Sequence, residues 1–275
     1  MNAPTHPLIT FIGGGNMASA IVGGLLRQGH PAGALQIVEP WDEQRARLAQ
    51  QFPGVALFAA AEARLQPSDL VVWAVKPQTF KDAALAAGPF LGQALHLSVA
   101  AGITSESMAA WLNTQRIVRA MPNTPALVGL GMTGLFGRDG ASAQDRGLIE
   151  TVVRTTGELV WVNTERDLDA VTAISGSGPA YVFYFLEAMR DAGTRMGLPA
   201  DTALQLAIGT FIGASTLAQR SGDAPQVLRE RVTSKGGTTY AAITAMDAAG
   251  MKASFEAALK AAQVRAEELG REFGG

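Results

Sequence analysis

Short apolar runs alternate with helix-like segments through the first part of the chain. The runs are rich in branched and aromatic residues, as buried strands are. They occupy residues 8–12, 35–39, 55–58, 69–75, 95–100, 116–121, 132–136 and 157–162. The segments between them show helical spacing, for example over 18–29, 43–51 and 143–154. Because strands that alternate with helices form parallel sheets covered on both faces, this pattern predicts a doubly wound α/β domain.

The pattern changes after Asn163. From there on strand signals disappear and helical segments follow one another closely. We expect helices over 167–174, 179–196, 200–220, 225–232, 238–248 and 251–273. The sequence therefore predicts two domains, an α/β domain over residues 1–163 and an all-helical domain over 164–275.

Three consecutive glycines stand where the first predicted strand turns into the first helix. Gly13, Gly15 and Ala18 fit the spacing G-x-G-x-x-G/A. In that pattern the first glycine makes a tight turn, the second lets backbone approach a pyrophosphate, and the third small residue lets helix pack on strand. A glycine turn without a ligand is the alternative. The order of strand, helix, second strand and terminal acid favours a dinucleotide site.

That terminal acid is Glu39, at the end of the second predicted strand. A carboxylate there can accept hydrogen bonds from the ribose hydroxyls of NADH, and it would repel the 2′-phosphate of NADPH. Arg45 or Arg47 could reach such a phosphate if Glu39 points away. The sequence favours NADH over NADPH.

Three further loops follow predicted strands and would line the same sheet edge, where ligands bind in open α/β sheets. They contain Lys76, Ala100 and the segment MPNTP at 121–125. Lys76 could contact a phosphate, act as a general acid, or simply be a solvated loop lysine. In MPNTP two prolines fix the backbone around Asn123, which suits a rigid polar shelf beside a nicotinamide ring. An ordinary proline-stiffened loop is the alternative.

A second glycine turn opens a helix in the helical half, within VTSKGGTTYAAI at 232–243. Ser234, Gly237, Thr238 and Thr239 present hydroxyls and backbone N–H groups there. Such a helix N-terminus binds a carboxylate as readily as a phosphate. A plain helix cap is the alternative reading.

Composition narrows the function classes. Of the 275 residues, 48% are hydrophobic and 17% charged, and the net charge is −2 with no basic run, which argues against nucleic acid as a partner. The chain has no cysteine, which excludes disulfides and thiolate catalysis. His6, His30 and His96 lack ligand spacing with carboxylates, so we expect no metal.

The longest uncharged stretch, 202–219, contains several polar residues and is a poor membrane span. A helix so apolar is expected to be buried, against a partner or its own subunit. The first residues also lack the charged region and cleavage site of a signal peptide. We expect a cytoplasmic protein without a membrane partner.

Taken together, several segments resemble those of the pyrroline-5-carboxylate reductases, in the right order and over nearly the whole chain. They are FIGGGNMASAI, AVKP, RAMPNTPALVGLGMT, SGSGPAYVF and VTSKGGTT. The one departure is Lys235, where the family commonly carries proline.

The resemblance implies an N-terminal Rossmann domain and a C-terminal helical domain that builds a homodimer by interleaving helices; rings of dimers are known in the family. It implies reduction of Δ1-pyrroline-5-carboxylate to L-proline, the last step of proline synthesis, with NADH or NADPH. The cofactor residues it implies are Gly13, Gly14, Gly15, Asn16, Met17, Glu39, Val75, Lys76, Pro77, Ala100 and Asn123. The implied substrate residues are Met121, Val232, Ser234, Gly237, Thr238 and Thr239, with Thr239 as the catalytic residue that forms a hydrogen bond with the ring nitrogen.

Two other functions remain open. A related β-hydroxyacid dehydrogenase or imine reductase is one, although such a dehydrogenase should carry a catalytic lysine on its first interdomain helix. Residues 164–181 contain no lysine. A non-catalytic dinucleotide sensor is the other, and it would have no need of the second anion-binding turn.

Overall fold

The computed structural model describes residues 6–62, 65 and 67–274. The chain divides into two compact units, one formed by residues 1–177 together with 262–275 and the other by residues 178–261. By spatial contacts the division thus falls after Ser177, whereas the strand pattern ends at Asn163.

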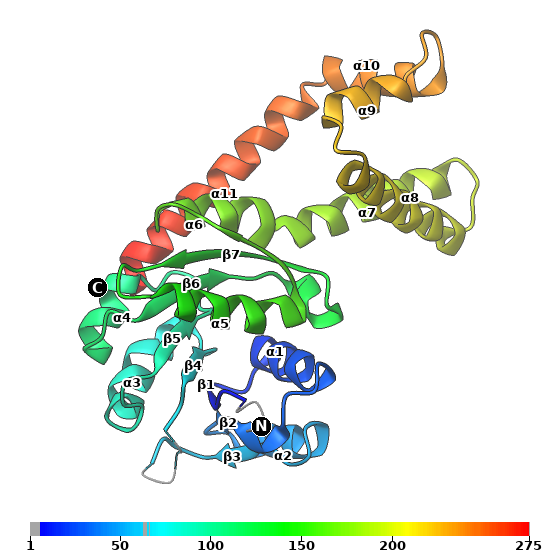
Figure 1. Cartoon of the computed structure of the whole chain (residues 1–275). Helices are drawn as coiled ribbons and strands as arrows, with labels where there is room; N and C mark the ends of the chain where they lie inside the picture. The colour runs from blue at the N-terminus through cyan, green and yellow to red at the C-terminus, as the bar shows by residue number, and fades with distance from the viewer. Residues whose placement is uncertain (1–5, 63–64, 66, 275) are drawn as a thin grey trace. The chain divides into compact units, whose positions relative to one another are not determined.

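The first unit is built on an eight-stranded sheet of order β3-β2-β1-β4-β5-β6-β7-β8 (Figure 1). Strands β1 to β6 are parallel, whereas β7 pairs antiparallel with β6 and parallel with β8. The strands are β1 Ile9–Ile12, β2 Leu35–Val38, β3 Ala56–Phe58, β4 Leu70–Trp73, β5 Leu95–Ser98, β6 Ile117–Met121, β7 Gly131–Gly137 and β8 Gly157–Trp161.

The predicted doubly wound fold is confirmed, with one difference at the end of the sheet. A parallel crossover takes about a dozen residues or more. Only residues 122–130 connect β6 to β7, and they hold a short 3-10 helix, Thr124–Val128. The connection is too short for a crossover, so β7 returns antiparallel.

Helices cover both faces of this sheet (Figure 1). On one face α1 (Asn16–Arg27), α2 (Asp42–Gln51) and α5 (Ala143–Val153) bury apolar side chains against the strands. On the other face lie α3 (Pro77–Ala87) and α4 (Ser105–Leu112). Successive strand residues point to opposite faces, so each strand feeds both cores.

The helical part follows the predicted segments within a few residues. Its helices are α6 Asp167–Val171, continued by a π-helical turn Thr172–Gly176, then α7 Gly178–Arg195, α8 Ala200–Ser221, α9 Pro225–Arg231, α10 Thr238–Ala248 and α11 Met251–Phe273. Helices α7 and α8 meet closely where a Cβ on Gly193 would lie 2.7 Å from the Cβ of Ala203. Few other residues of the second unit are buried.

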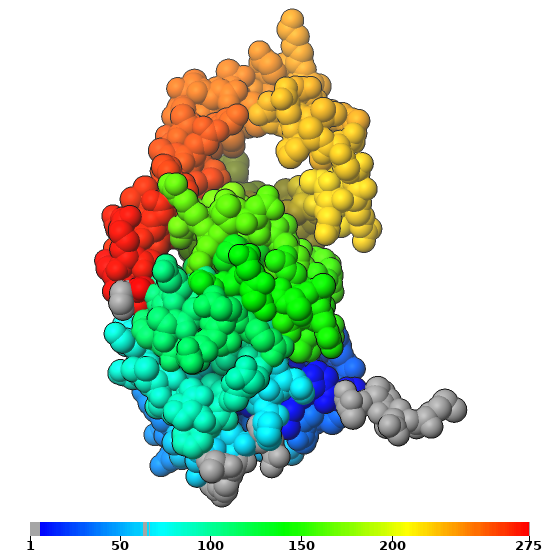
Figure 2. All heavy atoms as spheres, turned by 60° about the vertical axis from the view of Figure 1, so that its left-hand side comes forward, coloured from blue at the N-terminus to red at the C-terminus, as the bar shows by residue number. Residues whose placement is uncertain are grey.

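The end of α11 belongs to the first unit. Phe273 packs against the core between the sheet and helices α3 and α4. Figure 2 shows this last turn, in red, against the cyan-to-green surface of the first unit.

Candidate active site

The glycine turn has the geometry that the spacing predicts. Gly13 has a φ of +95°, and a Cβ there would lie 2.7 Å from the carbonyl oxygen of Ala74. A Cβ on Gly14 would lie 2.5 Å from a methyl of Leu48. Gly15, the N-cap of α1, faces open space, and its helix has no side-chain cap and no acid in the first turn. The open N-terminus fits a pyrophosphate.

Glu39 reaches back to this turn. Its Oε2 accepts a hydrogen bond from Gly14 N at 2.9 Å, and its Oε1 accepts one from Trp41 N at 3.0 Å. Arg45 donates to the Glu39 carbonyl oxygen at 2.7 Å and pairs with Asp42. Glu39 therefore lies beside the glycine turn, and Arg45, one of the two arginines considered for a phosphate, is engaged with other partners; the other, Arg47, is exposed on α2.

The neighbouring strand β4 brings residues 75–77 beside the glycine turn. A methyl of Val75 would lie 3.0 Å from a Cβ on Gly13. Lys76 is exposed and is the N-cap of α3, with Pro77 in the first turn. These residues share the sheet edge that the sequence predicted for them.

The side chain of Asn123 links three elements by hydrogen bonds, a role that the sequence did not suggest. Its Nδ2 donates to the carbonyl oxygen of Ser175 at 3.0 Å, and its Oδ1 accepts from Met132 N at 2.9 Å. The side chain thus ties the loop after β6 to the π-helical turn and to β7. Met121 packs beside the same turn, where a Cβ on Gly176 would lie 2.7 Å from its terminal methyl. Whether Asn123 also contacts a cofactor stays a prediction.

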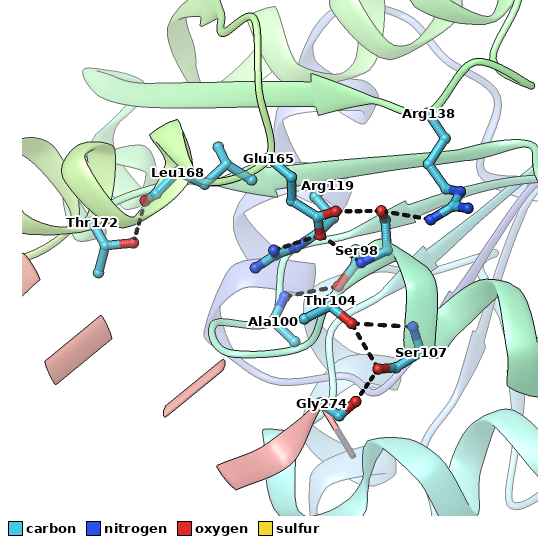
Figure 3. Close-up of polar contacts among 11 residues, drawn as sticks. Ser98, Ala100, Thr104, Ser107, Arg119, Arg138, Glu165, Leu168, Thr172 and Gly274 are labelled. Atoms are coloured by element: carbon cyan, nitrogen blue, oxygen red, sulfur yellow. Dashed lines mark hydrogen bonds and ion pairs between the residues drawn. The ribbon is translucent and has the colours of Figure 1, made fainter. Parts of the chain in front are cut away.

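The loop after β5 carries Ala100 and leads into α4. Here the structure adds a charged network absent from the sequence-based site (Figure 3). Glu165 accepts hydrogen bonds from both the N–H and the hydroxyl of Ser105, each at 2.5 Å, and from Arg119 at 2.8 Å. Burial alone would raise the pKa of Glu165, but the bonds from Ser105 and the charge of Arg119 hold it below its usual value. The one available signal was an arginine inside a buried strand, which needs an acidic partner.

The second predicted turn lies in the second unit, at the start of α10. Gly236 has a φ of +77°, and Gly237 is the N-cap, with its N–H donating to the Ser234 carbonyl oxygen at 3.0 Å. A Cβ on Gly237 would lie 2.7 Å from the hydroxyl of Ser234. Thr238 and Thr239 form the first turn, whose N-cap makes no side-chain hydrogen bond. Val232 caps the preceding helix α9 and is exposed.

The structure therefore gathers the predicted residues as two sets, one in each unit. The proposed cofactor residues and Met121 belong to the first unit, and the other proposed substrate residues to the second.

Among the described residues no group of three or more His, Cys, Asp or Glu side chains could hold a metal ion. Within the same part of the chain, every helix is too short or too polar to cross a membrane.

Comparison with known proteins decides the family. Residues 165–269 match the sequence model described as pyrroline-5-carboxylate reductase dimerisation, and residues 8–102 match that of NADP oxidoreductase, coenzyme F420-dependent. The chain is 44% identical over 270 residues to the pyrroline-5-carboxylate reductase of Pseudomonas aeruginosa, covering 98% of each chain. This chain belongs to the pyrroline-5-carboxylate reductase family.

Solved reductases share the fold as well. The structure of a pyrroline-5-carboxylate reductase from Coxiella burnetii is 36% identical, with a TM-score of 0.89 and coverage of 96% of this chain and 99% of that one. A Plasmodium falciparum pyrroline carboxylate reductase, solved with NADP bound, is 26% identical with a TM-score of 0.84, covering 96% and 98%. The resemblance seen in the motifs is confirmed, and the chain carries the family's dimerisation region.

Proposed function

We propose that this protein reduces Δ1-pyrroline-5-carboxylate to L-proline, the last step of proline synthesis, with NADH or NADPH. The observation that carries the proposal is that this member of the family has two helices that start at a glycine turn without a side-chain cap, one in each unit. One is α1, after Gly13–Gly15, and the other is α10, after Gly237. A dinucleotide pyrophosphate and a substrate carboxylate are the anions that such a reaction needs to hold.

The cofactor is assigned to Gly13–Met17, Glu39, residues 75–77, Ala100 and Asn123. Narrow spaces at the first two glycines and the open face at Gly15 support this assignment. When bound, NADH or NADPH supplies a hydride. The chain's own residues position the two reactants, because the protonated cyclic imine is already electrophilic.

The substrate is assigned to the turn before α10. Ser234, Gly237 and Thr238 are assigned to the carboxylate, and Val232 and Met121 are assigned to the substrate as well. The hydroxyl oxygen of Thr239 accepts a hydrogen bond from the ring N–H of the protonated imine. A threonine hydroxyl is a weak acid and a weak base, so its use here fits a reaction in which the positions of the reactants contribute more than acid–base catalysis.

We also propose that residues 164–275 form the dimerisation and substrate domain of a homodimer. Exposed apolar side chains on α7 and α8 support a partner of the same kind, since such faces are unfavourable in water. The cytoplasm is the proposed location.

The test is a fall in NADH or NADPH absorbance when pyrroline-5-carboxylate is added. Thr239→Ala should lower kcat/KM by the worth of one hydrogen bond, about 0.5–3 kcal/mol. Thr238→Ala should act mainly through the KM of the substrate. Thr151→Ala, which removes an exposed hydroxyl on α5, serves as the control. Unchanged kinetics in both turn variants would contradict the placement of the substrate.

The alternatives give different results in the same assay. A dinucleotide sensor would bind NADH without consuming it. A β-hydroxyacid dehydrogenase would act on a hydroxy acid and would need a catalytic lysine, which the stretch 164–181 lacks.

A further inference from the structure

Glu165, just ahead of α6, lies far in sequence from the loop that it holds. Its carboxylate contacts Ser105, the first residue of α4, and Arg119 on β6. We infer that Glu165 and the C-terminal turn of α11 position the loop 98–104 for cofactor binding, so that Glu165 is a positioning residue for NADH or NADPH. The inference rests on the proposed function, which assigns Ala100 in this loop to the cofactor.

The loop has little internal support. Of the described hydrogen bonds, the backbone N–H groups of residues 100–103 donate a single one, from Ala100 to the hydroxyl of Ser98 at 3.3 Å. One end of the loop is fixed in the sheet by β5, and the buried side chains of Ala100 and Ile103 pack in the core. Because few backbone hydrogen bonds hold the residues between, the remaining constraint comes from the other end, at Thr104 and Ser105.

Glu165 fixes that end through charge-assisted bonds. Both its oxygens accept from Ser105, and the second partner, Arg119, has a side chain only 12% exposed. Arg138 donates to the Ser105 hydroxyl at 3.1 Å and completes the network (Figure 3). Bonds to ionised groups are roughly twice as strong as neutral ones, and partial burial protects them from solvent.

The C-terminal turn presses on the same loop from a different side. Gly102 has a φ of +74°, and a Cβ there would lie 3.2 Å from the carbonyl oxygen of Leu269. The hydroxyl of Ser107 donates to the carbonyl oxygen of Gly274, and Ser107 N donates to the Thr104 hydroxyl at 3.1 Å. The loop is therefore held between α11 and Glu165, with glycine required at the point of contact.

The experiment measures dinucleotide binding directly, by nicotinamide fluorescence, before any substrate is added. Glu165→Gln keeps the size of the side chain but removes its charge. We expect the dissociation constants for NADH and NADPH both to rise about tenfold, because the bonds that hold the Ser105 end of the loop are weakened. At saturating cofactor kcat should stay within about twofold of wild type, since Glu165 touches no reacting atom.

Glu267→Gln is the matched control. A cavity of about 390 Å³ lies beside the loop, and both Glu165 and Glu267 line it. Glu267 pairs with Arg166 at 3.8 Å and makes no hydrogen bond to residues 98–104. Its variant should bind both dinucleotides like wild type. If Glu165→Gln fails to fold, Ser105→Ala and Gly102→Ala test the same positions without burying an unpaired charge, and each should weaken dinucleotide binding.

Several results would overturn the inference. If Glu165→Gln binds the dinucleotides with wild-type affinity, Glu165 does not position the loop. If that variant does not fold, wild-type affinity in both Ser105→Ala and Gly102→Ala contradicts the inference. If Glu267→Gln weakens dinucleotide binding as much as Glu165→Gln does, the loss of a negative charge in the cavity explains the effect, and not the hydrogen bonds to the loop. A wild-type protein that binds dinucleotides but does not reduce pyrroline-5-carboxylate refutes the proposed function and leaves this binding test intact.

Discussion

At the scale of single residues, Glu39 is the group expected to select the cofactor. Its carboxylate lies beside the glycine turn, bonded to Gly14 N, and Arg45 is held by Asp42 and the Glu39 carbonyl. A 2′-phosphate would meet negative charge there, so we predict a preference for NADH. A tenfold preference corresponds to about 1.4 kcal/mol, within reach of one charge.

The measurement is kcat/KM for NADH and NADPH in wild type and Glu39→Ser, which should shift the ratio toward NADPH. Glu43→Ser removes a nearby exposed carboxylate of α2 and controls for overall charge. A wild type that strongly prefers NADPH, or a ratio that Glu39→Ser leaves unchanged, would show that this role of Glu39 is wrong.

A second residue, His96, makes stability depend on pH. It is 2% exposed in β5, and its Nδ1 accepts a hydrogen bond from the Trp73 indole at 3.0 Å. Burial first, and the charge of Arg116 second, lower the pKa of His96 to about 4. The unfolded chain, with a histidine pKa near 6.5, binds the proton more readily, so stability is full above that value and falls as the pH drops toward 4.

We therefore expect wild type to lose roughly 2 kcal/mol of unfolding free energy from this group between about pH 7 and pH 5. His96→Gln cannot ionise and keeps an acceptor for the indole, so it should lose less over the same range. Urea unfolding of both proteins at the two pH values is the measurement. Parallel losses in the two proteins would exclude His96 as the cause.

At the scale of elements, helix α1 offers two adjacent glycines with opposite surroundings. A Cβ on Gly24 would lie 2.6 Å from the carbonyl oxygen of Thr155, whereas one on Gly23 would meet only the end of Arg27 at 3.3 Å and the ring of Phe52. Gly24→Ala should destabilise the protein by about 1–3 kcal/mol through overpacking. Gly23→Ala should be neutral or stabilising by up to about 1 kcal/mol, because alanine favours helix.

Thermal unfolding and dinucleotide titration of the two variants check this prediction. Because α1 starts at the glycine turn, a displaced helix should also weaken dinucleotide binding in Gly24→Ala. Similar behaviour of the two variants would mean that α1 does not pack on Thr155 as the structure has it.

The elements themselves were largely predictable, because period and breakers are local signals. Strands, helices and the glycine turn were predicted from the spacing of residues that lie close together in the sequence. The reversed direction of β7 depends on the length of the connection before it. The bond between Glu165 and Ser105 joins residues far apart in the chain, and the bracing role of Asn123 depends on the π-helical turn. Such contacts are set by tertiary packing, which a single sequence does not display.

At the scale of the whole molecule, the helical region is incomplete as a single chain. Exposed apolar side chains on α7 and α8 include Phe183, Tyr184, Leu206, Ile212 and Leu217. Of the 22 residues of α8 only Ala203 and Ala207 are buried. The sequence left open whether this helix is covered by its own subunit or by a partner. Its exposure within the described chain favours a partner, in keeping with the family's dimerisation region.

Gly209 and Gly213 lie on α8 at positions where the single subunit leaves room for a side chain. A Cβ on either would meet nothing within 4 Å in the described chain, so glycine there serves no packing need of the single subunit. We predict a dimer at micromolar concentration that Gly213→Leu weakens at least about tenfold, because a bulky side chain blocks close helix approach. Gly147→Leu on α5 is the matched control, since that glycine is also helical, exposed and without neighbours within 4 Å. Light scattering over a dilution series measures both variants, and a monomeric wild type would refute the dimer. Equal dissociation by the two leucines would place the interface away from this face of α8.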